Sequence, residues 1–351
     1  MTLAAKNAFV NPQRRNISNV IRCIYCKPRY RVKQPIRVGL ASRLQKETNP
    51  MSCDSLRTLL DVSGNPYGYR FDWVRRQTEA LGEASQGGPA LTLTPGDVTS
   101  AMECAGLWEA TSSPHAHARR RQSVGQQLAL THRVARRWMV AEAAAPVRPV
   151  SFVGTELDNH SWMTDTEVSW VARRSPEERM EVEHEMAAIL SRVGQQVSFR
   201  DPSNPTRVGL EWPLVEVGNL TLMSDEIDLC IGTHQVDGEG AWSNALLVNF
   251  CLETPSEADL DRLGFSAVMH TISMGCPPAR VISYGLLNGT ADYRDVDAEW
   301  LNLHFGFIMA TQRVIRSSQN SETLTLTPGP HCARCPERSE CPFSRIGLEE
   351  F

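Results

Sequence analysis

The spacing of apolar residues changes from helical at both ends of the chain to strand-like in its middle. Helical spacing predicts helices over 55–62, 69–84, 97–110, 122–142, 256–274 and 298–317, and another that Ser175 can cap. Aliphatic runs without that spacing predict strands over 219–234 and 244–254, joined by a turn over 236–243, and two more over 279–289 and 290–297. Strands alternating with helices predict an α/β core. The Gly and Pro content of 85–96 predicts a linker.

The first 50 residues differ in charge from the rest of the chain. They carry eleven Lys or Arg against the single acid Glu47, a net charge of +10, whereas the remainder has a net charge of −14. No lysine follows Lys46. The segment is either a basic, disordered arm that touches nucleic acid, with Cys23 and Cys26 as half of a zinc site, or an upstream stretch before a true start at Met51. The change in lysine usage favours the second interpretation over both the arm and an organelle transit peptide.

No apolar run in the sequence is long enough to span a bilayer, so we expect a cytoplasmic protein without a membrane partner. The ten cysteines are too dispersed for a disulfide scaffold, and in a reducing compartment they favour metal ligation. We expect Cys230 and Cys276, which have apolar neighbours, to be core residues.

Three of the cysteines cluster in the tail. Cys332, Cys335 and Cys341 follow a copy of LTLTPG, and the upstream copy of that string, at 91–96, leads to Cys104. Thiolates are soft ligands for iron-sulfur clusters or zinc, and either site needs four ligands. The spacing therefore predicts a site closed by one distant and three local cysteines. Zinc completed by His331 or Cys53 is the alternative, although His331 is expected to be structural.

The tail HCARCPERSECPF, paired with the upstream LTPGDVTSAMECAGLWEA, resembles the RecB-type PD-(D/E)XK exonucleases of the iron-sulfur branch. That branch includes the CRISPR-associated exonucleases and AddB-type nuclease domains. The resemblance implies a restriction-endonuclease-like α/β core with added helices, over 91–346, behind a basic extension (1–50) and a helical lead-in (51–90). It also implies a 4Fe-4S cluster that joins the two ends of this domain and is held by Cys104, Cys332, Cys335 and Cys341.

The same resemblance implies a site for Mg²⁺ or Mn²⁺ at which the expected motif is degenerate. Asp228 resembles the first metal-binding aspartate, but Asn249 stands where the next strand should carry an acid, and Cys251 where it should carry lysine. Strand alternation would put Glu253 on the same face, as a displaced metal ligand. His132 loosely matches a histidine that the family often has on an early helix.

These features predict a catalytically degenerate protein that acts as a DNA-binding or scaffold subunit in repair, recombination or mobile-element and phage defence. Its expected partners are DNA ends or single strands and a protein such as a helicase or nuclease subunit. Two alternatives remain: an active Mg²⁺- or Mn²⁺-dependent exonuclease using Asp228 and Glu253, and an iron-sulfur redox sensor. Six arginines, either phosphate contacts or solvated charges, complete the candidates: Arg119, Arg120, Arg121, Arg133, Arg136 and Arg137.

Overall fold

The computed structural model describes residues 56–60, 71–86, 88–112, 126–202, 205–209, 212–224, 227–236 and 241–320, together with 326, 329, 331, 332, 335 and 341. The basic extension, the Cys23/Cys26 pair, Cys53 and the arginines at 119–121 lie outside these residues, so nothing here bears on the predictions made for them.

A mixed five-stranded sheet forms the centre of the described fold and confirms the expected α/β class. Its strands are β2 (Thr206–Val208), β5 (Leu229–Ile231), β8 (Leu246–Cys251), β9 (Arg280–Gly285) and β10 (Ala291–Asp295), which lie side by side in chain order. Only β8 and β9 are parallel, with Leu246 opposite Arg280, and helix α10 (Glu257–Met274) makes the crossover between them. The antiparallel pair β5 and β8 sets Leu229 opposite Val248.

A smaller sheet corrects two of the sequence predictions. It consists of β1 (Leu91–Leu93), β4 (Leu220–Met223) and β3 (Leu214–Val217), in that order. The predicted linker over 85–96 therefore contains a strand, which pairs in parallel with β4. The predicted strand over 219–234 is divided between two sheets, since β4 and β5 belong to different ones. Likewise the predicted turn over 236–243 contains β7 (Ala241–Ser243), which pairs with β6 (His234–Val236).

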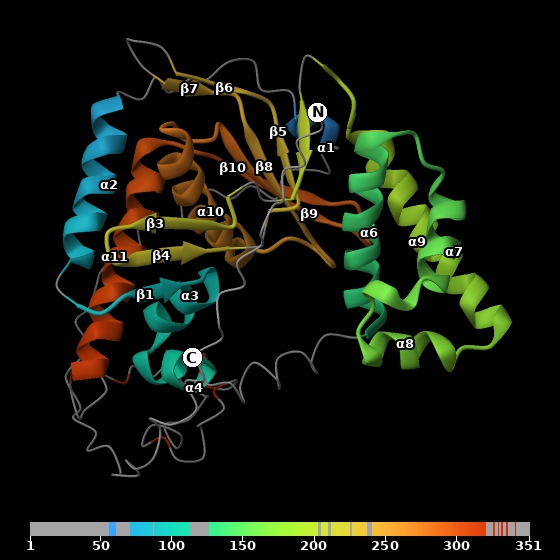
Figure 1. The fold of residues 1–351 in the computed structure, drawn as a ribbon, viewed down its shortest axis with the longest axis horizontal. Coiled ribbons are helices and arrows are strands. Elements are labelled where there is room, and N and C mark those ends of the chain that lie inside the picture. The colour runs from blue at the N-terminus through green and yellow to red at the C-terminus, as the bar shows by residue number, and fades with distance from the viewer. Residues whose placement is uncertain are drawn as a thin grey trace, which may run out of the picture.

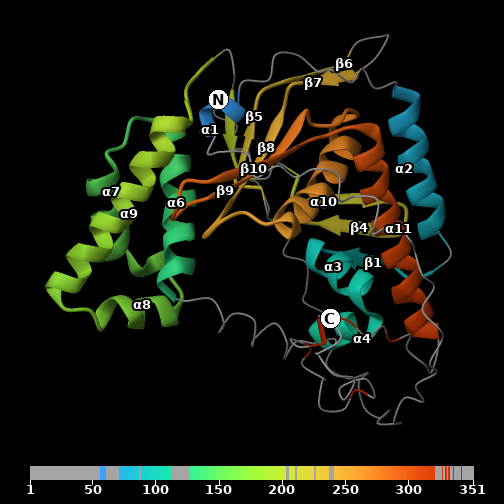
Figure 2. The same cartoon turned by 180° about the vertical axis from the view of Figure 1, so that it is seen from behind.

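Helices cover the central sheet on two sides (Figures 1 and 2). The bundle of α6 (Gln126–Ala144), α7 (Pro149–Asp158), α8 (Asp165–Ala172) and α9 (Pro176–Gln196) stands on one side, and α10, α11 (Ala298–Asn320) and α2 (Phe71–Ser85) stand on the other. Two hydrophobic clusters result. Leu246, Val248 and Phe250 of β8 pack with α6 and α9, whereas Leu247, between them in sequence, packs with α10 and α11. This alternation is what a strand buried on both faces requires.

The sequence predicted the N-terminal cap of some helices correctly and that of others wrongly. Ser175 caps α9 as predicted, and its hydroxyl accepts the N–H of Glu178. The predicted helix over 97–110 is instead two helices, α3 (Pro95–Glu103) and α4 (Ala105–Ser112), separated by Cys104 in an extended conformation. Thr94, rather than Asp97, is the N-cap of α3, and Asp97 completes its capping box. Helices α7 and α8 were not predicted.

The helical lead-in is attached to the core. In α1 (Leu56–Leu59) the side chains of Leu56 and Leu59 are buried in the α6/α9 cluster. The N–H of Leu56 donates to Oε1 of Gln196 at 2.8 Å, and Nη1 of Arg280 donates to the carbonyl of Leu59 at 2.9 Å. This short helix thus packs as part of the α/β core. Within the described residues, no helix combines the length and apolar character needed to cross a membrane.

His304 on α11 gives the fold a predictable response to acid. Its ring packs over Gly264 of α10, where a Cβ would overlap it, and beside Trp300, with ring centroids 4.3 Å apart. Burial lowers the pKa of His304 to about 4, and the positive charge of Arg294 contributes. The unfolded chain, with an ordinary histidine, binds this proton near pH 6.5, whereas the folded chain does not.

The neutral His304 therefore contributes stability that is complete above pH 6.5 and is lost as the pH falls towards 4. From pH 7.5 to pH 5 we expect the free energy of unfolding to fall by about 2 kcal/mol more in the wild type than in His304→Gln. Urea unfolding at the two pH values measures this difference. Equal pH dependence in the two proteins would contradict the assignment.

Candidate functional site

Asp228 lies immediately before β5 and is almost completely buried, with 1% of its surface exposed. Its N–H donates to the carbonyl of Val248 at 3.0 Å, and its Oδ2 accepts the N–H of Phe250 at 2.7 Å. The carboxylate therefore continues the ladder between β5 and β8 beyond the last paired residues. Because Leu229 is opposite Val248, the register places Asp228 across from Asn249. These are the neighbouring strands on which the resemblance expected the two metal-binding acids.

Helix α6 supplies two polar side chains to the Asp228 carboxylate. Nε of Arg136 lies 2.9 Å from Oδ1, an ion pair whose N–H is not aligned for a hydrogen bond, and Nε2 of His132 lies 3.4 Å from Oδ2. His132 and Arg136 are four residues apart and so share one face of the helix. They are 28% and 33% exposed, whereas the carboxylate between them is buried. The structure thus brings together Asp228 and His132, both predicted site residues, and adds Arg136.

The segment after Asn249 does not replace the missing acid and lysine. Cys251 ends β8, and burial raises the pKa of its thiol, although a hydrogen bond with Ser283 opposes this shift. The neutral thiol donates to the carbonyl of Glu253 at 3.2 Å. Because β8 ends two residues before Glu253, strand alternation does not extend to this residue, and the Glu253 side chain is exposed. The argument that placed Glu253 on the face of Asn249 is not supported.

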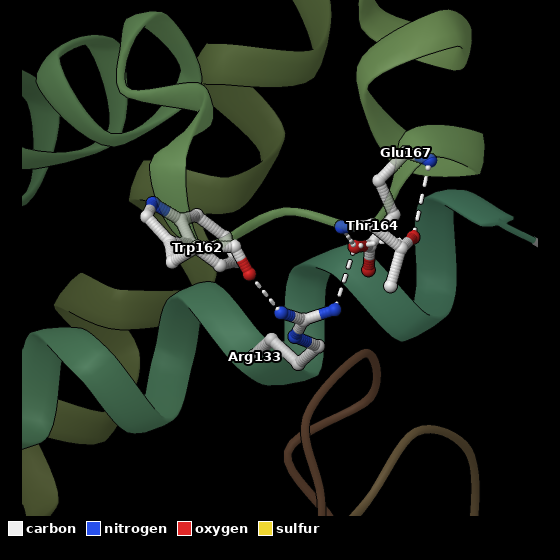
Figure 3. A network of polar contacts seen from close by, with 4 residues as sticks. All are labelled: Arg133, Trp162, Thr164 and Glu167. Atoms are coloured by element: carbon white, nitrogen blue, oxygen red, sulfur yellow. Dashed lines mark hydrogen bonds and ion pairs between the residues drawn. The ribbon is translucent and has the colours of Figure 1, made fainter.

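A second face of α6 holds the other two described arginines in ion pairs. Nη1 of Arg133 donates to Oε2 of Glu167 at 2.6 Å, and Nη2 donates to the carbonyl of Trp162. Figure 3 shows this network, in which the same Glu167 oxygen also accepts the N–H of Thr164 and so caps α8. The guanidinium of Arg133 lies 5.1 Å from the centre of the Trp162 ring.

Arg137 repeats this arrangement one helical turn later. Its Nε lies 2.5 Å from Oε2 of Glu156, and its guanidinium lies 4.9 Å from the same Trp162 ring. All three described arginines of α6 therefore have carboxylate partners on neighbouring elements. The sequence left phosphate contacts and solvated charges as alternatives for these arginines; in the structure each is paired with a buried acid, which it would have to leave to bind DNA.

Cys104 occupies the break between α3 and α4 and is buried. Its N–H donates to the carbonyl of Ser100, and its carbonyl accepts the N–H of Trp108. The tail passes beside it: a Cβ on Gly106 would lie 2.5 Å from Cδ2 of Leu326 and 3.6 Å from Sγ of Cys104. Leu326 belongs to the second LTLTPG copy, so this copy lies beside the segment that follows the first copy.

Backbone contacts between Gly329 and Cys335 fold the segment that holds Cys332 and Cys335 into turns. The N–H of Gly329 points at Sγ of Cys332 at 3.4 Å, and the N–H of Cys335 donates to the carbonyl of Cys332, also at 3.4 Å. His331 is buried, as expected of a structural residue. Cys230 and Cys276 are buried too, in agreement with their assignment to the core. In the part of the chain that the structure describes, no three His, Cys, Asp or Glu side chains are grouped to hold a metal ion.

The sequence analysis named Asp228 and His132 as candidate site residues, but it did not predict that Arg136 pairs with Asp228. Arg136 was expected to be either a phosphate contact or a solvated charge, although its spacing from His132 places it on the same helix face. The carboxylate partners Glu156 and Glu167 gave no signal, because the helices that carry them were not predicted. No protein-family model matches this chain, and no curated protein is similar to it.

Proposed function

We propose that this protein is a catalytically degenerate, nuclease-like iron-sulfur protein that serves as a non-cleaving scaffold subunit in DNA repair, recombination or defence against mobile elements. The observation that carries the proposal is the Asp228 carboxylate, which is buried and engaged by Arg136, His132 and the Phe250 N–H. A carboxylate that holds a catalytic Mg²⁺ must present free oxygen atoms to the ion.

The surroundings of Asp228 point in the same direction. Asn249, on the neighbouring strand, is a neutral ligand, and the Cys251 thiol carries no positive charge to position a water molecule or to neutralise phosphate. Metal-dependent phosphodiester hydrolysis needs both a bound cation and an activated water molecule. The described residues near Asp228 supply neither function.

The charge of the chain favours a protein partner. The α6 arginines are in ion pairs, and residues 51–351 carry a net charge of −14, which opposes broad affinity for DNA. A helicase or nuclease subunit is the partner class that the resemblance implies. DNA ends or single strands are bound within that assembly, in the cytoplasm.

The four candidate cysteines match a 4Fe-4S cluster in chemistry, although among the described residues no three of them are grouped around one point. Thiolates are the ligands that such clusters require, and N–H donors aimed at the ligand sulfur atoms stabilise their charge, as the Gly329 N–H does for Cys332. Leu326 brings the tail beside Gly106 and Cys104. Cys104, Cys332, Cys335 and Cys341 would hold the cluster, which supplies a cross-link between the two ends of the domain.

A nuclease assay on the full chain tests the proposed function. We expect no degradation of end-labelled single- or double-stranded DNA in Mg²⁺ or Mn²⁺ above the level of Asp228→Asn, which lacks the only predicted ligand that is buried at the site. The matched variant Glu253→Gln should also be indistinguishable from the wild type. Cleavage that needs Mn²⁺ and disappears in both variants would establish the exonuclease that uses Asp228 and Glu253 instead.

A further inference from the structure

We infer that the Arg136 guanidinium replaces a divalent cation as the counter-charge of Asp228, and that removing it opens a Mn²⁺ site made by Asp228 and His132. This inference rests on the proposed function, because it explains how a degenerate site keeps its aspartate without a metal. It concerns the residues around Asp228 and does not depend on the proposed iron-sulfur cluster.

The first argument is that the two oxygen atoms of the Asp228 carboxylate have different partners. Oδ2 accepts the N–H of Phe250 and faces Nε2 of His132, while the one partner of Oδ1 among the described residues is Arg136, at 2.9 Å. A metal ion would need Oδ1, and this oxygen is the one that the guanidinium covers. A cation cannot approach it while Arg136 stays, because two positive charges would share one carboxylate oxygen.

The second argument is burial. Asp228 is 1% exposed, and an ionised carboxylate in that position requires a positive partner. In a metal site the ion provides that charge. Here Arg136 provides it from outside the sheet: its side chain is 33% exposed, so it reaches inward from the helix surface.

The third argument is the set of atoms left when the guanidinium is absent. Oδ1 of Asp228 would have no partner among the residues that the structure describes, and the His132 ring nitrogen would remain close to the other oxygen. Asn249 lies across the strand pair with an amide oxygen in its side chain. Carboxylate and imidazole together suit Mn²⁺ better than Mg²⁺, which prefers oxygen ligands and retains its water.

The test measures Mn²⁺ binding to the full chain. Binding is detected as the loss of the free-ion signal in electron paramagnetic resonance, and thermal unfolding is the second readout. The proteins are the wild type, Arg136→Gln, Arg136→Met, which keeps the aliphatic stem, and the double variant Arg136→Gln/Asp228→Asn. In both single variants we expect Mn²⁺ affinity at least about tenfold above that of the wild type and a Tm that rises with Mn²⁺ concentration. The double variant should show neither effect.

Each other outcome contradicts the inference. Equal Mn²⁺ affinity in the wild type and the Arg136 variants would mean that the guanidinium does not cover a metal site, and binding that survives in the double variant would place the ion elsewhere. If the single variants unfold, Mn²⁺ must restore their folded circular-dichroism spectrum but not that of the double variant. Failure of these results leaves the proposed function intact, whereas Mn²⁺-dependent DNA cleavage by the wild type removes the proposed function itself.

Discussion

Replacing Asp228 with alanine should lower the free energy of unfolding by about 3 kcal/mol. The change removes the acceptor of the Phe250 N–H inside the sheet and leaves the Arg136 guanidinium beside an apolar cavity. Because Arg136 is partly exposed and can turn to solvent, we place the loss at the lower end of the range for broken buried ion pairs. Urea unfolding monitored by circular dichroism measures it.

The size of this effect separates a structural aspartate from an unused metal ligand. An acid that waits for a cation carries an uncompensated negative charge, and its removal would leave stability unchanged or improve it. Asp228→Asn is expected to lose less than Asp228→Ala, because the amide oxygen can still accept the Phe250 N–H. Glu253→Ala is the matched control: this side chain is exposed, so its removal should change stability by no more than about 0.5 kcal/mol. A stable Asp228→Ala protein would show that the ion pair with Arg136 does not support the fold.

The second large effect is expected on iron content. Purified without oxygen, the full chain should contain about four iron atoms and show the broad visible absorption of a 4Fe-4S cluster, and Cys104→Ser should lose most of both. Cys104 is the proposed ligand that lies far from the tail in sequence, at the break between α3 and α4. If the cluster forms as proposed, the substitution removes both a thiolate ligand and the cross-link between the two ends of the domain.

The control for this experiment is Cys276→Ala. Burial raises the pKa of Cys276 to about 11, so this thiol stays protonated and is a poor metal ligand. Its replacement should leave the iron content unchanged. Zinc without iron, or a Cys104→Ser protein that keeps its full metal content, would contradict the proposed ligand set. A cluster that is lost and restored reversibly in air, with a change in partner binding, would favour the redox sensor.

The sequence named some of the residues of the candidate site but did not predict their ion pairs. Asp228, Asn249 and Cys251 could be compared with an expected pattern because they lie at fixed spacing on two strands, and the absence of lysine after Lys46 needed no structure at all. The ion pair with Arg136 could not be read in this way, since 92 residues separate its partners. The same holds for the pairs that Arg133 and Arg137 form with acids on α7 and α8, whose formation the sequence did not signal.

Local information determined the elements whose signals are local. Helical spacing and caps predicted α2, α6, α9, α10 and α11, because side chains three or four residues apart meet on one helix face and a capping residue acts on its own first turn. The strands β8 and β9 were also predicted, since both are largely buried and rich in aliphatic and aromatic residues.

Long-range pairing decided the rest. The composition around strand β1 predicted a linker. The strand forms because Leu91–Leu93 pairs with β4, which lies about 130 residues later in the chain. The run over 219–234 looks like one strand, but its two halves find partners in different sheets. A strand needs the backbone hydrogen bonds of a neighbouring strand, and a buried carboxylate needs a positive partner; both come from residues far away in sequence. The sequence by itself therefore determined the α/β class, because its signals are local, and the tertiary structure decided that Arg136 pairs with Asp228, because the two residues meet only in the folded chain.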